Sequence, residues 1–329
     1  MTPIAPHVTA FFQQRLPVER GNSQHTIDSY AYALKLLLEY ASDQLGAAPS
    51  QLHLEQIEAT LVSNFLSHLE SERGNTPRTR NARLAAVKSF MRFVEYRVPA
   101  AIEQVRRVLA IPAKKTDGRL VKHLTLDEVR AVLDVPDLRT RMGVRDRAML
   151  HLCFAGALRV SELVGLTLAD VTLGDQPSIR VRGKGRRERC LPLWKQVLAD
   201  LRAWMALRGE PPVPEVFVNR RDRQLTRSGV AYLLKKHVRH AAKACSSLDG
   251  KQLSPHVLRH TCALMILQAT GDIRKVSLWL GHANIQTTQC YLEVDPTERL
   301  EAIEAITPPA LRVGGFRPSD ELIASLTAR

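Results

Sequence analysis

This sequence of 329 residues has few cysteines and no long apolar segment. Its five cysteines are spread along the chain, none of them in a CxxC pair, so a disulfide scaffold is excluded. No apolar run approaches the roughly 18 residues of a membrane span, and no signal peptide follows Met1. The apolar content of 45% excludes disorder over the whole chain. Together these features predict a soluble protein of a reducing cytoplasm, with no membrane partner.

Acidic residues are also scarce relative to basic ones. The chain has 47 Lys and Arg against 33 Asp and Glu, which gives a formal net charge of +14 at pH 7. Such an excess suggests a polyanionic partner, most often a nucleic acid. A generically basic cytosolic enzyme is the alternative interpretation.

The first third of the chain predicts a small helical bundle, because apolar residues recur at helical spacing in three stretches. These residues are Ile27, Tyr30, Leu34 and Leu37, then Leu61, Phe65 and Leu69, then Leu84, Val87, Met91 and Val94. Thr76 before Pro77 is a start signal for the third helix. Almost no acidic residue offsets the cations on its polar side, which are Arg78, Arg80, Arg83, Lys88 and Arg92. That side either contacts DNA or is a plain solvated surface.

Breaks in composition suggest the domain organisation. We expect a helical domain over residues 1–111, which binds DNA if its basic helix does, a basic linker over 112–122, a second domain over 123–306 and a C-terminal tail over 307–329. The linker combines proline, glycine and cations, among them Lys114 and Lys115. Its charge would let it lie along a phosphate backbone.

The second domain is predicted to be mixed α+β, mostly helical with one small antiparallel sheet. Residues 178–193 alternate as a hairpin around Gly183, Lys184 and Gly185. The helix signals are a Thr125–Glu128 capping box, a start at Ser254 and Pro255 with an end at Gly271, a start at Asp272 with an end at Gly281, and a cap at Asn284. One more helical stretch is expected over residues 296–306.

Polar residues suited to chemistry are densest in residues 254–262 and 280–291. His256 and Arg259 lie three apart, so one helix side would present a proton-transfer group beside a permanent cation. His282 directly follows the predicted helix end, and Tyr291 lies nine residues further on. His256 and His260 also have zinc-ligand spacing, but the glutamate base of a zinc hydrolase is missing between them. Taken singly, each of these residues could equally be structural.

Two other segments strengthen the chemical interpretation. Arg159 follows an apolar helix expected over residues 149–158, where a charge requires an anionic partner. Lys184 lies between two glycines at a hairpin tip, either as turn decoration or where the backbone can approach a nucleic-acid groove. Glu162 and Glu293 are the nearest carboxylates, too few for a two-metal nuclease. Glu162 is therefore expected to orient a neighbouring basic group or N-terminal amides.

Six separated residues form one ordered motif. In chain order they are Arg159 in ALRVSEL, Lys184 in GKG, His256 and Arg259 in an HxxRH box, His282 in LGH, and Tyr291. With this order and spacing, the sequence resembles the tyrosine recombinase or phage integrase family over residues 124–299. The first hundred residues are similar to that family's helical core-binding, SAM-like domain. One departure is Ala-Gly-Ala-Leu before Arg159, where relatives often have Thr-Gly-Leu. The resemblance implies that the two domains form a C-shaped DNA clamp.

The resemblance also implies a site-specific recombinase that forms a 3′-phosphotyrosine link at Tyr291. Lys184 would protonate the leaving 5′ oxygen, and His256 and His282 would assist proton transfer and orientation. Arg159 and Arg259 suit the nonbridging phosphate oxygens, because guanidinium groups present paired donors. No metal or other cofactor is expected. The remaining cations expected to bind DNA phosphates are Arg78, Arg80, Arg83, Lys88, Lys114, Lys115, Arg186, Arg187 and Arg189.

The expected partners are a double-stranded recombination site and further protomers, as a homotetramer or a hetero-oligomer with a related recombinase, in the cytoplasm on the nucleoid. Two alternatives remain at this point. A type IB topoisomerase uses similar groups to nick and reseal one strand, and a non-catalytic regulator would use only the basic helix. Since the first helix begins near Met1, no further N-terminal domain is expected. Integration, excision, resolution and transposition all remain open.

Overall fold

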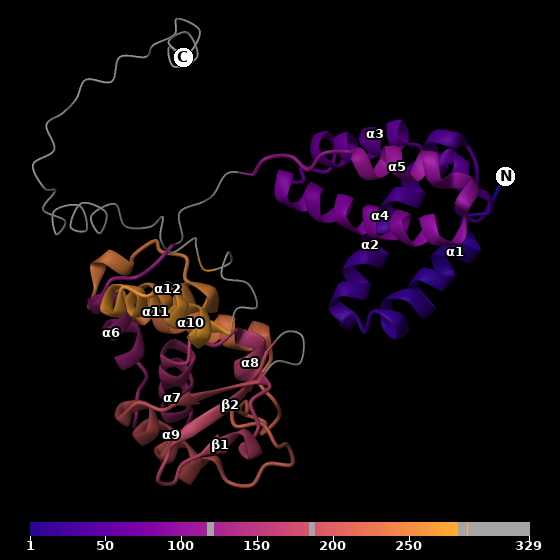
Figure 1. The fold of residues 1–329 in the computed structure, drawn as a ribbon. Coiled ribbons are helices and arrows are strands. Elements are labelled where there is room, and N and C mark those ends of the chain that lie inside the picture. The colour runs from indigo at the N-terminus through magenta and orange to yellow at the C-terminus, as the bar shows by residue number, and fades with distance from the viewer. Residues whose placement is uncertain (117–121, 184–187, 282–287, 289–329) are drawn as a thin grey trace, which may run out of the picture. The chain divides into compact units, whose positions relative to one another are not determined.

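The computed structural model describes residues 1–116, 122–183, 188–281 and 288. The chain divides into two compact units, Met1–Gly118 and Arg119–Arg329 (Figure 1). The described residues are mainly helical with one small antiparallel sheet, as predicted from the sequence. None of the described helices is long and apolar enough to cross a membrane. The finer domain boundaries expected from the sequence remain a prediction.

The first unit is a helical bundle. Its elements are α1 (Ala5–Ala10), the π-helical turn η1 (Phe11–Glu19), α2 (Gln24–Leu45), α3 (Ala59–Ser71), α4 (Pro77–Arg97) and α5 (Ile102–Ala110), with short 3-10 turns η2 (Pro49–Gln51), η3 (Leu54–Gln56) and η4 (Pro99–Ala101). The three predicted helices are α2, α3 and α4, and their apolar residues contribute to one core. α1, η1 and α5 were not predicted, because each buries only one or two side chains or none.

Local signals explain where α4 begins and what it buries. The Thr76 hydroxyl accepts a hydrogen bond from the Thr79 backbone N–H at 3.3 Å, and Pro77 is the first helical residue, as predicted. Leu84, Val87 and Met91 lie in the core of the unit. Of the cations of this helix, Arg78 and Arg92 are exposed, whereas Arg80 is buried.

The predicted linker is attached to the first unit over the part that the structure describes. Arg80 Nη1 donates to the Pro112 carbonyl at 3.1 Å, and Lys114 exchanges two backbone hydrogen bonds with the Asn81 side chain. Lys114 Nζ lies 2.7 Å from Glu70 Oε2. The start of this segment is thus held along α4 by tertiary contacts, which the composition of the segment alone does not indicate.

The second unit is mostly helical and contains one three-stranded sheet. Its elements are α6 (Leu126–Asp134), α7 (Arg141–Ala155), α8 (Val160–Val164), η5 (Leu168–Asp170), β1 (Val171–Thr172), β2 (Ser178–Arg182), β3 (Glu188–Pro192), α9 (Lys195–Arg208), α10 (Arg227–Ala241), η7 (Ser246–Leu248), α11 (Pro255–Thr270) and α12 (Ile273–Leu280). The strands are antiparallel in the order β1-β2-β3, with Ile179 opposite Leu191. The predicted hairpin is confirmed, and β1 adds a third strand.

Most of the predicted helix ends of this unit are confirmed. Thr125 and Glu128 form both hydrogen bonds of the capping box at the start of α6. Asp272 caps α12, and Gly271 and Gly281 adopt the left-handed conformation that ends α11 and α12. Ser254 precedes α11 as predicted, but its side chain makes no capping hydrogen bond. The expected cap at Asn284 and the helix over residues 296–306 lie outside the described residues.

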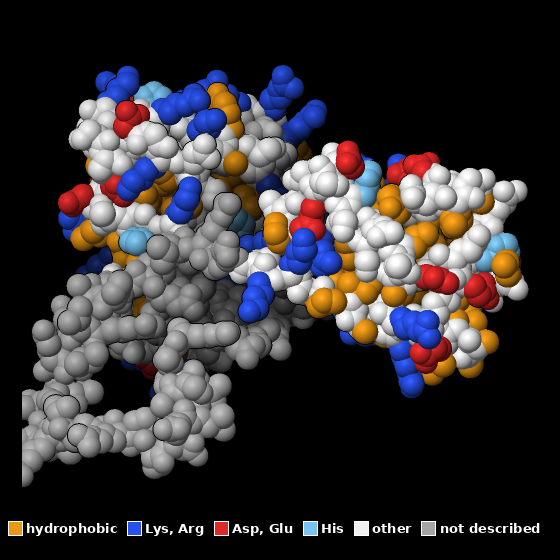
Figure 2. All heavy atoms as spheres, turned by 90° about the horizontal axis from the view of Figure 1, so that it is seen from above, with side chains coloured by type: hydrophobic (Ala, Val, Ile, Leu, Met, Phe, Trp, Pro, Cys, Tyr) orange, Lys and Arg blue, Asp and Glu red, His pale blue; other side chains and the backbone are white. Residues whose placement is uncertain are grey.

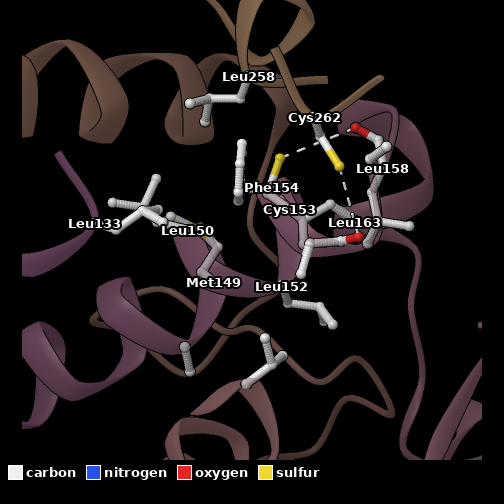
Figure 3. Close-up of a cluster of buried hydrophobic side chains, with 14 of the residues drawn as sticks. Leu133, Met149, Leu150, Leu152, Cys153, Phe154, Leu158, Leu163, Leu258 and Cys262 are labelled. Atoms are coloured by element: carbon white, nitrogen blue, oxygen red, sulfur yellow. Dashed lines mark hydrogen bonds between the residues drawn. The ribbon is translucent and has the colours of Figure 1, made fainter. Parts of the chain in front are cut away.

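The helix α7 is central to this unit and packs against α9 and α11. Figure 3 shows Phe154 and Cys153 of α7 facing Leu258 and Cys262 of α11. These side chains are at most 7% exposed. Burial of this apolar surface holds the end of α7 against α11, and the segment that follows α7 carries Arg159.

Candidate active site

The turn that leads from α7 to Arg159 is strained at a residue other than glycine. Gly156 has an ordinary φ of −79°, whereas Ala157 has a φ of +45° and is fully buried. A left-handed conformation costs a non-glycine residue about 1–2 kcal/mol. Gly156 instead permits a close approach, since a Cβ there would lie 3.1 Å from the Leu152 carbonyl oxygen and the Leu158 side chain. The Ala-Gly-Ala-Leu sequence thus assigns the close approach and the left-handed turn to different residues.

Arg159 lies directly before α8 and pairs with Glu162. Its backbone N–H donates to Glu162 Oε2 at 2.9 Å, and its Nη1 donates to Glu162 Oε1 at 2.7 Å. The predicted anionic partner of Arg159 is therefore Glu162 among the described residues. The Arg159 side chain keeps 30% of its surface exposed, so part of the guanidinium remains accessible.

Arg259 lies on α11, and its side chain reaches the region of Glu162. It is deeply buried, at 3% exposed. Its Nη1 donates to the carbonyl oxygen of the strained residue Ala157, and its Nη2 donates to the Leu280 carbonyl at 2.8 Å. Nη1 also lies 4.0 Å from Glu162 Oε2. One guanidinium thus joins α11 to the turn before Arg159 and to the end of α12.

Glu162 is the centre of this cluster, with a side chain only 3% exposed. Besides Arg159, it accepts two hydrogen bonds from Arg189 of β3, at 3.1 and 2.9 Å. Burial alone would raise the pKa of Glu162, but the hydrogen bonds and charges of Arg189 and Arg159 outweigh it and hold that pKa below its ordinary value. Glu162 is therefore ionised at neutral pH, and it orients basic groups and the Arg159 backbone amide, as predicted.

The lowered pKa of Glu162 predicts an acid-sensitive contribution to stability. Because the folded-state pKa is below the unfolded value, this contribution is present above the ordinary carboxyl value of 4.5 and is lost as pH falls through the folded-state pKa. We expect Glu162→Gln to unfold more easily at pH 7 and to lose less stability than the parent below pH 4.5. Urea unfolding from pH 7 to pH 3 measures this difference, and parallel curves for the two proteins would contradict it.

The other predicted catalytic residues are placed only in part. His256 lies exposed in the first turn of α11, one turn before Arg259. Lys184, in the segment after β2, lies outside the described residues. His282 and Tyr291 also lie outside them. α12 ends at Leu280 and Gly281, directly before His282 in sequence. The structure therefore brings Arg159 and Arg259 together around Glu162, with His256 on the helix of Arg259.

Two buried cysteines and a tryptophan support the end of α7. Trp279 Nε1 donates to the Ala155 carbonyl at 3.0 Å, and the Cys262 thiol also approaches that oxygen, at 3.8 Å. Burial raises the pKa of both Cys153 and Cys262 to about 12, so both are neutral thiols at physiological pH. They act as packing residues beside the site (Figure 3). Within the described ranges, no group of three His, Cys, Asp or Glu side chains could hold a metal ion.

The predicted DNA-binding cations of the first unit lie in different environments. Arg78 is exposed, and Lys88 is partly exposed with a pKa lowered by burial and by the charges of Arg92 and Arg80. Arg83 lies over the Tyr32 ring at 4.7 Å. Arg80, however, is 7% exposed and holds Pro112, so its contacts favour a structural role. Of the linker residues, Lys114 pairs with Glu70 and Lys115 is exposed.

The sequence interpretation missed a basic face on α10. This helix contains no acidic residue, and its cations Arg227, Lys235, Lys236 and Arg239 are all exposed. Its inner face is fixed by a 2.8 Å hydrogen bond between the buried side chains of His237 and Asp146. Figure 2 shows more Lys and Arg than Asp and Glu side chains on the visible face of the second unit, to which α10 belongs. The absence of acidic residues between 227 and 244 was the available signal.

Comparison with known proteins places this fold and site in a defined class. The phage integrase family profile matches residues 122–298, and the phage integrase N-terminal SAM-like domain matches residues 10–97. The mainly helical second unit therefore contains a phage integrase catalytic domain. The chain belongs to the phage integrase family and is a tyrosine recombinase.

Relatives match over nearly the whole chain. A putative integrase/recombinase of Sinorhizobium fredii, y4rC, is 41% identical and covers 99% of this chain and 98% of its own. The tyrosine recombinase XerC of Pelobacter propionicus is 30% identical over 94% of this chain and 98% of its own. Among solved structures, the Tn1549 transposon integrase in complex with transposon right end DNA has a TM-score of 0.69 at 18% identity, covering 94% of this chain and 100% of that one. The XerH recombinase in a post-cleavage complex with its difH substrate has a TM-score of 0.67 at 23% identity, covering 87% and 81%.

Proposed function

We propose that this protein cuts and rejoins specific DNA sites through a 3′-phosphotyrosine intermediate at Tyr291. The observation that carries the proposal is the placement of Arg159 and Arg259 around the buried Glu162. Arg159 Nη1 lies 2.7 Å from Glu162 Oε1, and Arg259 Nη1 lies 4.0 Å from Glu162 Oε2. Guanidinium groups stabilise the charge that grows on phosphate oxygens in the transition state, most strongly where they are preorganised. Glu162 and the Ala157 and Leu280 carbonyls supply that preorganisation without any external ligand.

The remaining roles follow from the chemistry of each group. Tyr291 attacks the scissile phosphate, and Lys184 protonates the leaving 5′ oxygen, for which a mobile ammonium is suited. His256 assists proton transfer at the tyrosine, and His282 orients the phosphate or the nucleophile. The covalent link conserves the energy of the phosphodiester, so the 5′ hydroxyl of a partner strand can reverse the step without ATP or a metal ion.

Covalent capture tests this proposal. The parent protein is incubated with a nicked suicide substrate carrying the end sequences of its own mobile element or chromosomal site. We expect a denaturation-resistant DNA adduct, and mass spectrometry of its peptides should place the nucleotide on Tyr291. An adduct on any other residue, or no adduct on DNA that the protein binds, would overturn the proposal.

The proposed assembly is a tetramer on two synapsed duplexes, acting on the nucleoid in the cytoplasm. Support comes from a protein that shares this fold. The lambda integrase was solved as a tetramer bound to a Holliday junction, and its structure has a TM-score of 0.61 at 15% identity. Recombination between two duplexes needs such an assembly, whereas relaxation of supercoils needs one protomer. Counting protomers on a synthetic Holliday junction by multi-angle light scattering tests it, and a single protomer per junction would contradict it.

General DNA binding is proposed for the exposed cations of α4 and α10. Each phosphate contact contributes a slope of about 0.9 in the dependence of log affinity on log salt concentration. We expect Arg78→Ala to weaken DNA binding and to reduce this slope by about 0.9. Arg107→Ala is the matched control, because Arg107 is an exposed cation of α5 that already pairs with Glu103 at 3.3 Å. Fluorescence anisotropy of labelled DNA at salt concentrations from about 50 to about 300 mM measures the slope for each variant. Equal slopes for the parent and Arg78→Ala would contradict the assignment.

A further inference from the structure

We propose that Arg189 is a positioning residue that joins the β2–β3 hairpin to the turn of Arg159 and to the end of α12. The inference rests on the proposed function and deepens it. From sequence, Arg189 was expected to be one of several general phosphate contacts on the hairpin flank. Its contacts in the structure point instead to the catalytic groups themselves.

The first observation is the geometry of the Arg189 ion pair. Both terminal nitrogens of its guanidinium donate to Glu162, one to each carboxylate oxygen, at 3.1 and 2.9 Å. The two side chains are only 11% and 3% exposed. The same carboxylate holds the backbone and the side chain of Arg159. Arg189 and Arg159 are therefore two cations that share one buried anion, and a movement of either changes the position of the other.

The second observation is the close approach of Arg189 to Gly281. A Cβ at Gly281 would lie 3.1 Å from both Cδ and Nη1 of Arg189, and Gly281 has a φ of +63°. The Arg189 side chain thus packs on the backbone at the end of α12. Arg259 binds the neighbouring Leu280 carbonyl, so the residues directly before His282 are held by two arginines.

The third observation is the contrast with Arg180 and Arg182, the two described cations of β2. Arg180 and Arg182 of β2 keep 43% and 63% of their side chains exposed and pair with Asp170 and Glu188, away from Glu162. Arg189 is instead held inside the protein by both carboxylate oxygens of Glu162, so its removal should change the reacting geometry far more than the affinity for DNA.

This arrangement links three segments that each carry a proposed catalytic residue. β3 directly follows the segment of Lys184, α8 begins after Arg159, and α12 ends before His282. Arg189 lies on β3 and contacts Glu162 of α8 and Gly281 at the end of α12. A displacement of about 1 Å in a reacting group can reduce a rate by about 100-fold, so such a link has a measurable catalytic effect.

The test compares Arg189→Met with Arg182→Met, which removes the same charge from the neighbouring strand. The readouts are the maximal single-turnover cleavage rate at saturating protein, the protein concentration at half-maximal rate, and thermal unfolding. We expect Arg189→Met to lower the maximal rate about 100-fold, with the half-maximal concentration changed less than about threefold. Arg182→Met should change the maximal rate less than about threefold. Arg189→Lys, which retains the charge but not the paired donors, should recover part of the rate and serves as the test if the Met variant does not fold.

A double-mutant cycle decides whether Arg189 acts through Glu162. If it does, adding Arg189→Met to Glu162→Gln should cost less than about threefold beyond Glu162→Gln alone. Independent, multiplicative losses would overturn the proposal, as would a loss confined to DNA affinity or a rate equal to that of Arg182→Met. If the parent forms no adduct on DNA that it binds, the proposed function itself fails and the role of Arg189 fails with it. An active parent with an unaffected Arg189→Met variant refutes only the role of Arg189.

Discussion

Tyr291→Phe is expected to form no covalent DNA adduct and to bind DNA as the parent does. An unperturbed tyrosine hydroxyl has a pKa of about 10, so only about one part in a thousand is phenolate at neutral pH. The oxygen must therefore be activated by a neighbouring base or cation before it can attack, and phenylalanine has no oxygen to activate. Denaturing electrophoresis on a nicked suicide substrate measures the adduct, and anisotropy measures binding.

Tyr232→Phe is the matched control for this experiment. Tyr232 is 69% exposed on α10, so its hydroxyl can be removed without disturbing the core. This variant should form the adduct at the rate of the parent, within about threefold. An adduct that persists in Tyr291→Phe would show that another residue is the nucleophile.

Arg259→Ala is expected to reduce both cleavage and stability. Loss of one preorganised donor to a developing oxyanion lowers a rate by about 100- to 1000-fold. The substitution also leaves the buried Ala157 and Leu280 carbonyls without this donor and removes a cation near Glu162, so we expect a loss of about 3 kcal/mol in the free energy of unfolding. Single-turnover cleavage and urea unfolding measure the two effects.

Two further variants separate the catalytic from the structural contribution of Arg259. Arg259→Lys keeps the charge, but one ammonium cannot replace a planar fork that reaches two carbonyls, so cleavage should remain about 100-fold reduced while part of the stability returns. Arg274→Ala removes an 81% exposed arginine of α12 that pairs with its neighbour Asp272, and it should change neither property appreciably. A lysine variant with the full parental rate would contradict the proposed role of the paired donors.

Local sequence signals predicted the start of α4, the start of α6 and the ends of α11 and α12 correctly. Caps and helix ends depend on neighbouring residues only, such as Thr76 with Pro77 or a glycine that adopts a positive φ. The strain in the turn before Arg159 was not predictable in this way. Glycine is the usual left-handed residue, yet here the buried Ala157 adopts that conformation beside Gly156. The Ala157 carbonyl is held in place by Arg259, which lies far along the chain.

The identity and order of the proposed catalytic residues are readable from the linear sequence, because the chemistry expected of Arg159, Arg259 and Tyr291 resides in the side chains themselves. The prediction for Glu162 was also made from the sequence, because the few carboxylates near these residues argue against a two-metal site. Whether a cation faces DNA or serves the protein depends on residues that are distant in sequence. Arg80 is buried against Pro112, and Arg189 is paired with Glu162, although the sequence places both among exposed phosphate contacts. Burial and ion pairing arise only when separate segments meet in the folded chain, so the tertiary structure alone distinguishes these arginines from the exposed ones.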